Sequence, residues 1–528
     1  MHLNPATSSD SVLSADETIA AVRNITSAWR ATLTRMPGKT ALICGENSLN
    51  HLELAKQVMV LARALNTAGV KPGDRVVVFL ENSIEFAASM LAILELQAVF
   101  VPISPQTRSD KLVFILEDTQ ASALVSQVSL TRVWSVAAEQ PGLQQTLMML
   151  LADQLLVEPS VVTEEGDSDD AFAPFSAVCA DDDLAAIIYT SGTTGYSKGV
   201  MLSHGNIYAS RHNVQSYLEL RSDDVIGLAL PLAFSYGLYH LIMGLWLGAT
   251  IVIERNVVFP VVMLKSWEQH RVTVFPGVPT LFASLLTQDL SAYELQSLRL
   301  ITNAGSALSE KTATRVRQAF PQTRLFLMYG LTECKRASYL SPTDLDARAN
   351  SVGKGLPAQR HWLIDNEGRE VVQGQTGQLV VAGPHVMKGY WRRPAETAQV
   401  LRPAPDGTPA LYTGDLFYSD ADGYLYFIAR SDDIIKSRGE KVSPLEVERA
   451  ICELPEVLDA VVTGVADDIL GMAVRAYIKL SPGALLVERA VIRHCLARLD
   501  SVMVPKSVIF VEEFPMADSG KIRRASLK

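Results

Sequence analysis

The sequence has few cysteines, and none is spaced for a metal site or a disulfide framework. Its 528 residues include five cysteines and nine histidines. The cysteines are scattered without a Cys-x-x-Cys pair, and no two histidines stand four residues apart, as zinc ligands on one helix face would. This pattern predicts reduced thiols in a cytoplasmic protein and gives no support to a zinc site.

The sequence also lacks an excess of positive charge and a long apolar run. The net charge is −10 and the pI is about 5.5, whereas a protein that binds duplex nucleic acid is expected to be basic, so we expect no nucleic-acid partner. The longest apolar run, residues 241–253, is shorter than a membrane span and contains two glycines. It predicts a buried helix, a turn and a strand. With no secretory signal at the polar, acidic N-terminus, we expect a cytoplasmic protein without a transmembrane segment.

What is present is a globular composition, 48% hydrophobic and 20% charged, on a chain too long for one core. Residues 72–125 alternate short apolar strands with helical patterns, and the alternation resumes over residues 185–340, which predicts parallel, doubly wound sheets. Residues 354–383 contain short alternating runs with Gly and Asp turns, as in a small antiparallel barrel. Residues 130–183 are less regular and predict a variable surface connection.

The character of the chain changes near residues 430–433. Ser443, Pro444 and Glu446 form a helix-start signal, and an alternating strand, a helix and a further strand follow. The fold class expected is α/β: a large N-terminal domain, residues 1–430, of doubly wound sheets plus a small β-barrel, and a small mobile α+β C-terminal domain, residues 431–528.

Three local features carry further expectations. Residues 1–17 are rich in Ser, Asp and Ala and are expected to be mobile, and a helix is expected over 19–33. A hairpin is expected over 39–50. Asn82, three residues before Glu85, predicts a capping pair that opens the next helix.

The most informative stretch is the loop after an apolar strand at residues 184–189. It places hydroxyl side chains, glycines and one lysine together: Thr190, Ser191, Gly192, Thr193, Thr194, Gly195 and Lys198. Glycines let backbone N–H groups approach an anion, and the lysine adds a point charge, so the loop predicts a polyphosphate cradle. Tyr196 and Ser197 separate Gly195 from Lys198, which disfavours a P-loop nucleotide hydrolase. A flexible linker is the alternative, and its position directly after a buried strand speaks against it.

Residues 190–204, Thr-Ser-Gly-Thr-Thr-Gly-Tyr-Ser-Lys-Gly-Val-Met-Leu-Ser-His, resemble the phosphate loop of the AMP-forming acyl-adenylate superfamily. This superfamily comprises acyl-CoA synthetases, 4-coumarate–CoA-ligase-like enzymes, stand-alone adenylation enzymes and luciferases. Five motifs of the superfamily follow in order between residues 76 and 521.

The resemblance implies roles for three of these motifs. In Tyr329-Gly-Leu-Thr-Glu333, it implies that Tyr329 stacks on adenine, Thr332 touches phosphate and Glu333 holds Mg²⁺, a chemically sensible ligand for that ion. Asp415 matches the ribose-binding aspartate. Lys521, in a Ser-Gly-Lys loop near the C-terminus, matches the catalytic lysine.

The fourth motif resembles the hinge of the superfamily, although Ala429 stands where the usual residue is glycine. The resemblance implies that Arg430 reaches the ribose, that Asp432 is the pivot, and that Gly439 lets the thiol arm pass along its channel.

The acyl pocket is the least specified part. The resemblance assigns Phe234, Tyr236 and Gly305 to the pocket, and Ser306 to the flank of adenine. Amino-acid-activating domains usually carry an aspartate where Ser235 stands. A pocket without that ammonium partner favours a neutral acyl or aryl acid.

The expected function is ATP-dependent activation of a carboxylic acid, fatty or aryl, to acyl-AMP, followed by transfer to a thiol, with CoA as the expected acceptor. ATP, Mg²⁺ and CoA or phosphopantetheine are the expected cofactors, and a small carboxylic acid is the expected partner. The alternative is a stand-alone adenylation enzyme that loads a separate acyl carrier protein. A non-catalytic nucleotide-binding protein with a relic site is the third hypothesis, and a luciferase-like oxygenase stays open on fold alone.

Overall fold

The computed structural model describes residues 24–143, 147–156, 179–190, 197–255, 259–404, 406–437, 440–467, 470–517 and 521–527. The segment expected to be mobile, residues 1–17, lies outside them. The helix expected over 19–33 corresponds, in the described residues, to α2, Ile25–Arg35. All five cysteines lie in these ranges and carry free thiols.

The first layer is a seven-stranded sheet in the order β18-β8-β7-β4-β3-β5-β6. Its strands β3 to β7 pair in parallel, as the alternating pattern predicted, and β8 returns antiparallel to β7. The strand bounds are β3 Arg75–Phe79, β4 Val99–Ile103, β5 Ala123–Ser126, β6 Met148–Leu151, β7 Leu184–Thr190, β8 Lys198–Ser203 and β18 Gly389–Tyr390. The phosphate-loop motif therefore connects two neighbouring strands of this sheet.

The second layer is a nine-stranded sheet in the order β15-β14-β13-β12-β11-β9-β10-β1-β2. The expected hairpin forms its β1–β2 edge. The strand bounds are β1 Thr40–Cys44, β2 Asn47–Asn50, β9 Val225–Leu228, β10 Thr250–Ile253, β11 Val274–Gly277, β12 Leu300–Asn303, β13 Arg324–Tyr329, β14 Ser338–Leu340 and β15 Lys354–Gly355. Strands β9 to β13 pair in parallel, so their carboxyl ends meet at one edge, where ligands of open α/β sheets bind.

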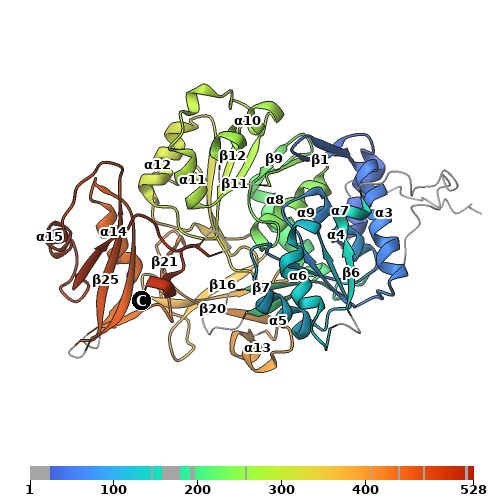
Figure 1. Cartoon of the computed structure of the whole chain (residues 1–528). Coiled ribbons are helices and arrows are strands. Elements are labelled where there is room, and N and C mark those ends of the chain that lie inside the picture. The colour runs from blue at the N-terminus through green and yellow to red at the C-terminus, as the bar shows by residue number, and fades with distance from the viewer. Residues whose placement is uncertain are drawn as a thin grey trace, which may run out of the picture.

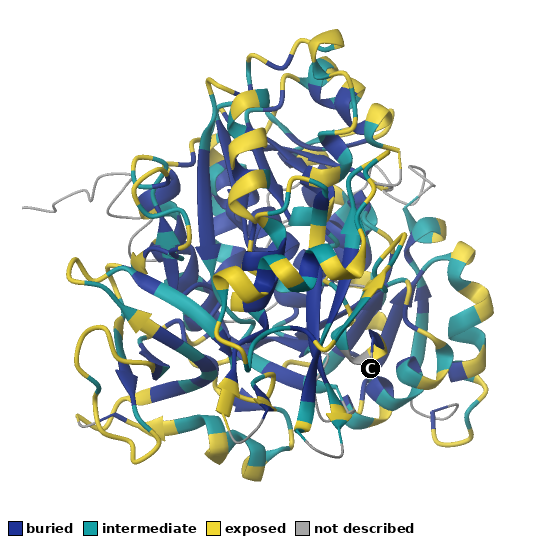
Figure 2. Ribbon diagram, turned by 90° about the vertical axis from the view of Figure 1, so that its left-hand side faces the viewer, coloured by how far each residue is buried: buried dark blue, intermediate teal, exposed yellow. Residues whose placement is uncertain are grey.

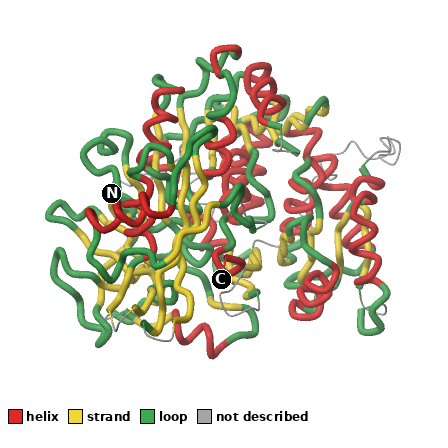
Figure 3. The backbone as a smooth tube through the Cα atoms, turned by 60° about the vertical axis from the view of Figure 1, so that its left-hand side comes forward, coloured by secondary structure: helices red, strands yellow, loops and turns green. Residues whose placement is uncertain are grey.

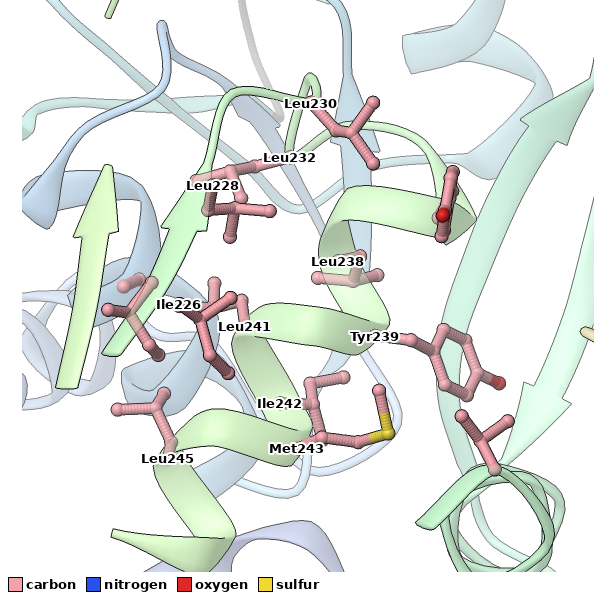
Figure 4. Packing of buried hydrophobic residues seen from close by; sticks show 14 of the residues in the cluster. Ile226, Leu228, Leu230, Leu232, Leu238, Tyr239, Leu241, Ile242, Met243 and Leu245 are labelled. Carbon is pink, nitrogen blue, oxygen red and sulfur yellow. The ribbon is translucent and has the colours of Figure 1, made fainter. Parts of the chain in front are cut away.

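Helices cover both sheets and complete the largest core (Figures 1 and 3). Their bounds are α3 His51–Thr67, α4 Ile84–Glu95, α5 Ser109–Thr119, α8 His204–Leu218, α9 Ser235–Leu247, α10 Pro260–His270, α11 Pro279–Leu285 and α12 Glu310–Ala319. The apolar run at 241–253 is the buried end of α9, a left-handed Gly248 and β10, as expected. In Figure 4 the leucines of α9 face Ile226 and Leu228 of β9, while Tyr239 leaves the helix on another side.

A third sheet of the large lobe is antiparallel. It has the order β16-β17-β20-β19, with β21 paired to β20. The bounds are β16 Arg360–Ile364, β17 Gly377–Ala382, β19 Leu401–Pro403, β20 Pro409–Ser419, β21 Leu425–Arg430 and, beside β19, the helix α13 Pro394–Val400. Residues 354–383, predicted to form a small antiparallel barrel, contribute β16 and β17 to this sheet, whereas Lys354–Gly355 form β15 of the nine-stranded sheet.

The C-terminal lobe begins after a turn at residues 431–433 and has its own sheet and core (Figure 1). The sheet order is β23-β22-β25-β24, with β26 parallel to β25. The bounds are β22 Ile435–Ser437, β23 Glu440–Val442, α14 Pro444–Cys452, β24 Val457–Asp467, β25 Gly471–Leu480, α15 Glu488–Arg498 and β26 Ser507–Phe510. The Ser443 hydroxyl caps α14 by accepting from the Glu446 N–H, which confirms the start signal in the sequence.

Burial follows the layers. Figure 2 shows the strands of the large lobe largely buried and the outward faces of its helices exposed. Of the helices in the described ranges, none combines the length and the hydropathy of a membrane span.

Two local expectations are wrong. Residues 130–183 are not only a surface connection, because they contain α6 (Thr131–Ala138), α7 (Ala152–Leu155) and the edge strand β6. The N-cap of α4 is Ser83, whose hydroxyl accepts from the Phe86 N–H, and not Asn82.

Asn82 is used instead to join the two large sheets. Its amide nitrogen donates to the carbonyl of Leu230 at 3.0 Å and, at 3.4 Å, to that of Glu254, while its oxygen accepts from the Leu232 N–H at 2.9 Å. These groups follow β9 and β10, so a side chain after β3 satisfies loop backbone of the other sheet. A nearest-neighbour capping rule cannot detect such a long-range partner.

Replacing Asn82 with Ala should therefore destabilise the large lobe more than replacing Ser83 with Ala. Asn82→Ala leaves three backbone groups without their partner and should cost about 3 kcal/mol, whereas loss of the cap at Ser83 costs about 1 kcal/mol. Urea unfolding followed by tryptophan fluorescence measures both. A larger loss for Ser83→Ala would contradict the role given to Asn82.

Candidate active site

The base of the phosphate loop is built from the facing ends of two strands. Thr190 ends β7 and Lys198 opens β8, the two residues are paired, and the Thr190 hydroxyl donates to the Lys198 carbonyl at 3.4 Å. The Trp391 N–H donates to the Gly199 carbonyl at 2.7 Å, which braces the exit of the loop. The residues of the motif from 191 to 195, namely Ser191, Gly192, Thr193, Thr194 and Gly195, lie outside the described residues.

A tyrosine that sequence reasoning did not single out connects this loop to the second motif. Tyr390, on β18 beside β8, donates its hydroxyl to Glu333 Oε1 at 2.8 Å. The Lys198 ammonium lies 5.2 Å from the centroid of the same ring. Burial and the neighbouring Glu333 raise the pKa of Tyr390, so the hydroxyl stays a donor. The phosphate-loop lysine and the expected Mg²⁺ ligand are thus brought together.

Glu333 and Thr332 lie in the turn that follows β13, at the carboxyl edge of the nine-stranded sheet. Both are half-buried. The Glu333 carbonyl accepts from the Met387 N–H at 2.8 Å, which fixes the turn against the segment that leads to Tyr390. One oxygen of the Glu333 carboxylate is engaged by Tyr390, and a carboxylate so placed can accept a hard cation.

The third motif forms a buried carboxyl centre with Tyr329. The Tyr329 hydroxyl, at the end of β13, donates to Asp415 Oδ2 at 2.5 Å. Asp415 lies on β20 and is 2% exposed. Burial raises its pKa to about 6, against the opposing attraction of Arg430 and the hydrogen bond from Tyr329. Asp415 Oδ1 has no hydrogen-bond partner among the described residues, so it can accept a donor from a ligand.

Arg430 and Asp432 connect this centre to the start of the C-terminal lobe. Arg430, the last residue of β21, places Nε 3.5 Å from Asp415 Oδ1 and 3.4 Å from Asp432 Oδ1. The Ser431 N–H donates to the carbonyl of Gly414, which has a left-handed φ of +74°. Asp432 is exposed in the turn between the lobes, where a pivot was expected, and Gly439 lies outside the described residues.

Lys521 reaches the site from the C-terminal lobe. Its Cε lies 3.7 Å from the position that a Cβ would take on Gly305, in the loop after β12 of the large lobe. The pKa of Lys521 is lowered, first by desolvation and then by the cation of Arg430, while Glu333 and Asp415 oppose the shift. The side chain nevertheless contacts solvent.

The loop that carries Lys521 is held at its base. The Ala517 N–H donates to the Lys521 carbonyl at 2.7 Å, and Met516 pairs with Ile522 across the loop. Arg524 then forms a two-point ion pair with Glu448 of α14.

The residues assigned to the acyl pocket lie around the start of α9 and the end of β12. Phe234 precedes α9 and is half-buried. The buried Tyr236 hydroxyl lies 2.7 Å from Thr302 Oγ1. Gly305 and Ser306 are exposed in the loop that follows, and the Asn303 amide donates to the Ser306 carbonyl at 3.0 Å.

Two cations in this region were not anticipated from the sequence. Lys335 and Arg336 follow the glutamate motif and are 2% and 4% exposed. The Arg336 Cζ lies 4.5 Å from the centroid of the Tyr236 ring. A Lys-Arg pair in a loop is usually read as solvated, so only the packing could place it beside the pocket.

Two family models and several known proteins are similar to this chain. The family model described as AMP-binding enzyme matches residues 29–391, and that of the AMP-binding enzyme C-terminal domain matches residues 446–521. A feruloyl-CoA synthase of Amycolatopsis is 32% identical over 508 residues, which is 95% of this chain and 98% of that one. A long-chain-fatty-acid–CoA ligase of Salmonella typhimurium is 29% identical over 87% of this chain and 86% of its own.

Among solved structures, an anthranilate CoA ligase in complex with anthranoyl-AMP superposes with a TM-score of 0.84 at 25% identity. The match covers 96% of this chain and 96% of the ligase.

The lowered pKa of Lys521 generates a prediction that requires no substrate. Because more of its amine is neutral near pH 7.5, Lys521 should react with limiting acetic anhydride ahead of the exposed Lys56 of α3, as peptide mass spectrometry can measure. Arg430→Gln removes the cation that lowers the pKa of Lys521 most and should slow the labelling of Lys521 alone. Labelling that is no faster than at Lys56, or that Arg430→Gln leaves unchanged, would contradict the electrostatic account.

Proposed function

This chain belongs to the family of AMP-binding enzymes, and from that premise we propose how its residues carry out the ligase reaction. The enzyme is an AMP-forming acid–thiol ligase of the acyl-CoA synthetase type: it uses ATP to convert a small carboxylic acid to acyl-AMP and transfers the acyl group to CoA. The observation that supports the residue assignment best is the position of Lys521, from the C-terminal lobe, beside Gly305 and within electrostatic reach of Glu333 and Asp415.

The nucleotide is proposed to lie along the carboxyl edge of the nine-stranded sheet. The free Asp415 Oδ1 accepts from the ribose, with Arg430 beside it and the Tyr329 ring at the adenine; Ser306 flanks the base. The phosphates lie toward Thr332 and the phosphate loop, residues 190–195, with Lys198. Backbone N–H groups and one lysine are the donors that polyphosphate requires.

Glu333 is the residue that would hold Mg²⁺, oriented by the hydrogen bond from Tyr390. One carboxylate together with substrate phosphates is the usual protein contribution to a magnesium site. The ion would supply charge neutralisation on the phosphates.

The first half-reaction is the attack of the substrate carboxylate on the α-phosphorus, with pyrophosphate as the leaving group. The negative charge that gathers on the α-phosphate oxygens faces the Lys521 ammonium, and Lys198 faces the leaving group. Most of the catalysis is therefore positional and electrostatic. The lowered pKa of Lys521 in the ligand-free site rises once the phosphates bring in negative charge, so the amine is charged when it is needed.

The second half-reaction needs the amine out of the way and a thiol in its place. We propose that residues 431–528 turn as a unit about Asp432 relative to residues 1–430, which withdraws Lys521 and brings the backbone at Gly439 to the pocket as the thiol channel. The exposed turn at 431–433 supports this role, since it joins two lobes with separate cores. Two positions of one lid then serve two reactions in one site.

The carbon skeleton of the acid is proposed from the pocket residues and the relatives. Phe234, Tyr236 and Gly305 form the wall of the acyl pocket, and the named relatives act on aromatic and long-chain acids, so a fatty or aryl skeleton is proposed. The alternative acceptor is the phosphopantetheine of a separate acyl carrier protein. Measuring AMP release with CoA and with a phosphopantetheinylated carrier protein distinguishes these two acceptors.

The free cysteines are consistent with a proposed cytoplasmic location.

Lys521→Ala should abolish one half-reaction and spare the other. Acid-dependent exchange between ATP and labelled pyrophosphate should fall about 100- to 1000-fold, because a preorganised charge at the transition state is lost. Thioester formation from supplied acyl-AMP and CoA should persist. Lys506→Ala, an exposed lysine of the same lobe, is the control for both assays. Equal loss of both activities would overturn the division of roles. If the wild-type enzyme released pyrophosphate with none of the acids, a relic site would be favoured.

The raised pKa of Asp415 predicts a pH dependence of nucleoside binding. Ribose hydroxyls donate to the ionised carboxylate, so adenosine affinity should be full above about pH 6 and fall by up to tenfold per unit below it. Adenosine is the ligand for the calorimetric titration because it carries no phosphate to titrate. Asp415→Asn should bind about 10- to 100-fold more weakly at pH 8 and lose the pH step. An unchanged step in the variant would exclude Asp415 as its source.

A further inference from the structure

Two buried cations stand beside the acyl pocket without an acid to balance them. Lys335 and Arg336 are 2% and 4% exposed. In the described part of the chain neither residue takes part in an ion pair, and each donates to a backbone carbonyl, Lys335 to that of Ser235 and Arg336 to that of Lys335. Buried charges are normally paired, because an unpaired one costs several kcal/mol of solvation. An uncompensated guanidinium at this position therefore points to an anion that arrives with a ligand.

The free donors of Arg336 have the geometry of a carboxylate site. Its Nη1 donates to the Lys335 carbonyl at 3.0 Å. Its Nε and Nη2 are buried and have no hydrogen-bond partner among the described residues. These two nitrogens form one edge of the guanidinium, the edge that binds both oxygens of a carboxylate in two parallel hydrogen bonds.

The position of Arg336 connects this edge to the reaction site. Its guanidinium lies over the ring of Tyr236, 4.5 Å from the centroid, and Tyr236 is hydrogen-bonded to Thr302 at the end of β12. Gly305, which lies next to Lys521, is three residues after Thr302, in the loop that follows β12. Arg336 is also near enough to contribute to the lowered pKa of Lys521. The cation thus lies on the acyl side of the site.

Lys335 holds the backbone next to Arg336 in place. Its ammonium donates to the Ser235 carbonyl at 2.7 Å and lies 4.1 Å from the centroid of the Tyr239 ring. Its φ of +61° is in the left-handed region, which costs energy for a side chain of this size and is retained where packing imposes it.

The neighbouring polar groups do not neutralise this positive charge. His240 donates from Nδ1 to the Tyr236 carbonyl at 2.9 Å, and burial lowers its pKa to about 3, so it is neutral. The Tyr217 phenol interacts with the Arg336 guanidinium, and burial raises the pKa of Tyr217 and of Tyr236, so neither phenol is an anion. Stacking on Tyr236 stabilises the guanidinium but does not replace a counter-ion.

We propose that the acid activated by this enzyme carries a second carboxylate, remote from the reacting one, and that the Nε–Nη2 edge of Arg336 binds it at the base of the acyl pocket. The inference rests on the proposed function and specifies its substrate as a dicarboxylic acid. The second carboxylate supplies the missing counter-charge of Arg336. Binding at Arg336 also orients the carbon skeleton, so that only the other carboxylate, the reacting one, meets the α-phosphate.

The experiment compares dicarboxylic acids with their methyl half-esters, which keep the length and the reacting carboxylate but lose the second charge. The series runs from malonic to adipic acid and includes the benzenedicarboxylic acids. The readout is kcat/KM for acid-dependent pyrophosphate release with ATP. The wild-type enzyme should prefer at least one diacid over its half-ester by about 100-fold, the usual effect of removing one partner of a buried charged hydrogen bond.

Arg336→Met should abolish this preference, because it lowers kcat/KM for the diacid far more than for its half-ester. Arg336→Lys keeps the charge without the two-point edge and should lie between. The matched control is Arg211→Met: Arg211 is also a buried arginine stacked on an aromatic ring, Trp246, which lies about 15 Å further along α9 than Tyr236. That variant should keep the wild-type preference.

Each outcome decides the inference. The wild-type enzyme could show equal kcat/KM for the diacids and for their half-esters or simple monocarboxylic acids. That result would overturn the inference and leave the ligase function standing, even if the Arg336 variants failed to fold. A diacid preference that survives Arg336→Met, or disappears equally in Arg211→Met, would overturn the role of Arg336. Failure of every acid to release pyrophosphate would overturn the proposed function together with the inference.

Discussion

The hydrogen bond between Tyr329 and Asp415 is the interaction on which the arrangement of the site depends. It joins the carboxyl end of β13, in the nine-stranded sheet, to β20 of the antiparallel sheet, at 2.5 Å and in a nearly dry environment. A carboxylate at 2% exposure is costly unless its oxygens are satisfied. Tyr329 satisfies one oxygen and Arg430 approaches the other, so three structural elements are held in one relative position. The remaining lone pairs are left for a ligand.

The same centre links nucleotide binding to the small lobe. Arg430 ends β21, and the turn that contains Asp432 begins directly after it. The tail loop with Lys521 is anchored at its other end by the Arg524–Glu448 pair and by the buried Leu527. Because the loop is fixed to its own lobe, movement of that lobe carries the amine with it. A charge delivered in this way is present when its lobe is docked and absent when the lobe turns.

The sequence predicted the parts of the molecule that depend on local pattern. The alternation of strands and helices, the hairpin at β1 and β2 and the Ser443 cap all require only neighbouring residues. The short motifs also assigned Asp415, Arg430 and Lys521 to one site, and the structure brings those three residues together. The assignment of Asn82 to a helix cap failed because its partners follow β9 and β10, about 150 residues away.

The same limit explains the functional residues that the sequence did not reveal. Tyr390 reaches Glu333 only because β18 pairs with β8 at the edge of the seven-stranded sheet. Lys335 and Arg336 look like a solvated pair until the start of α9 packs against them. Polar residues whose role depends on a long-range packing partner carry no local signal, whereas glycine, proline and capping patterns do.

The central claim is that the amine of the C-terminal tail lies at the phosphates of a nucleotide bound to the large lobe. An ATP derivative with a lysine-reactive acyl group on its terminal phosphate tests this most directly, because it transfers the acyl group only to amines next to the phosphate chain. Mass spectrometry should find the label on Lys521 together with Lys198, and excess ATP should prevent labelling of both. Labelling that reaches Lys198 but never Lys521, in the presence or absence of the acid, would contradict the account.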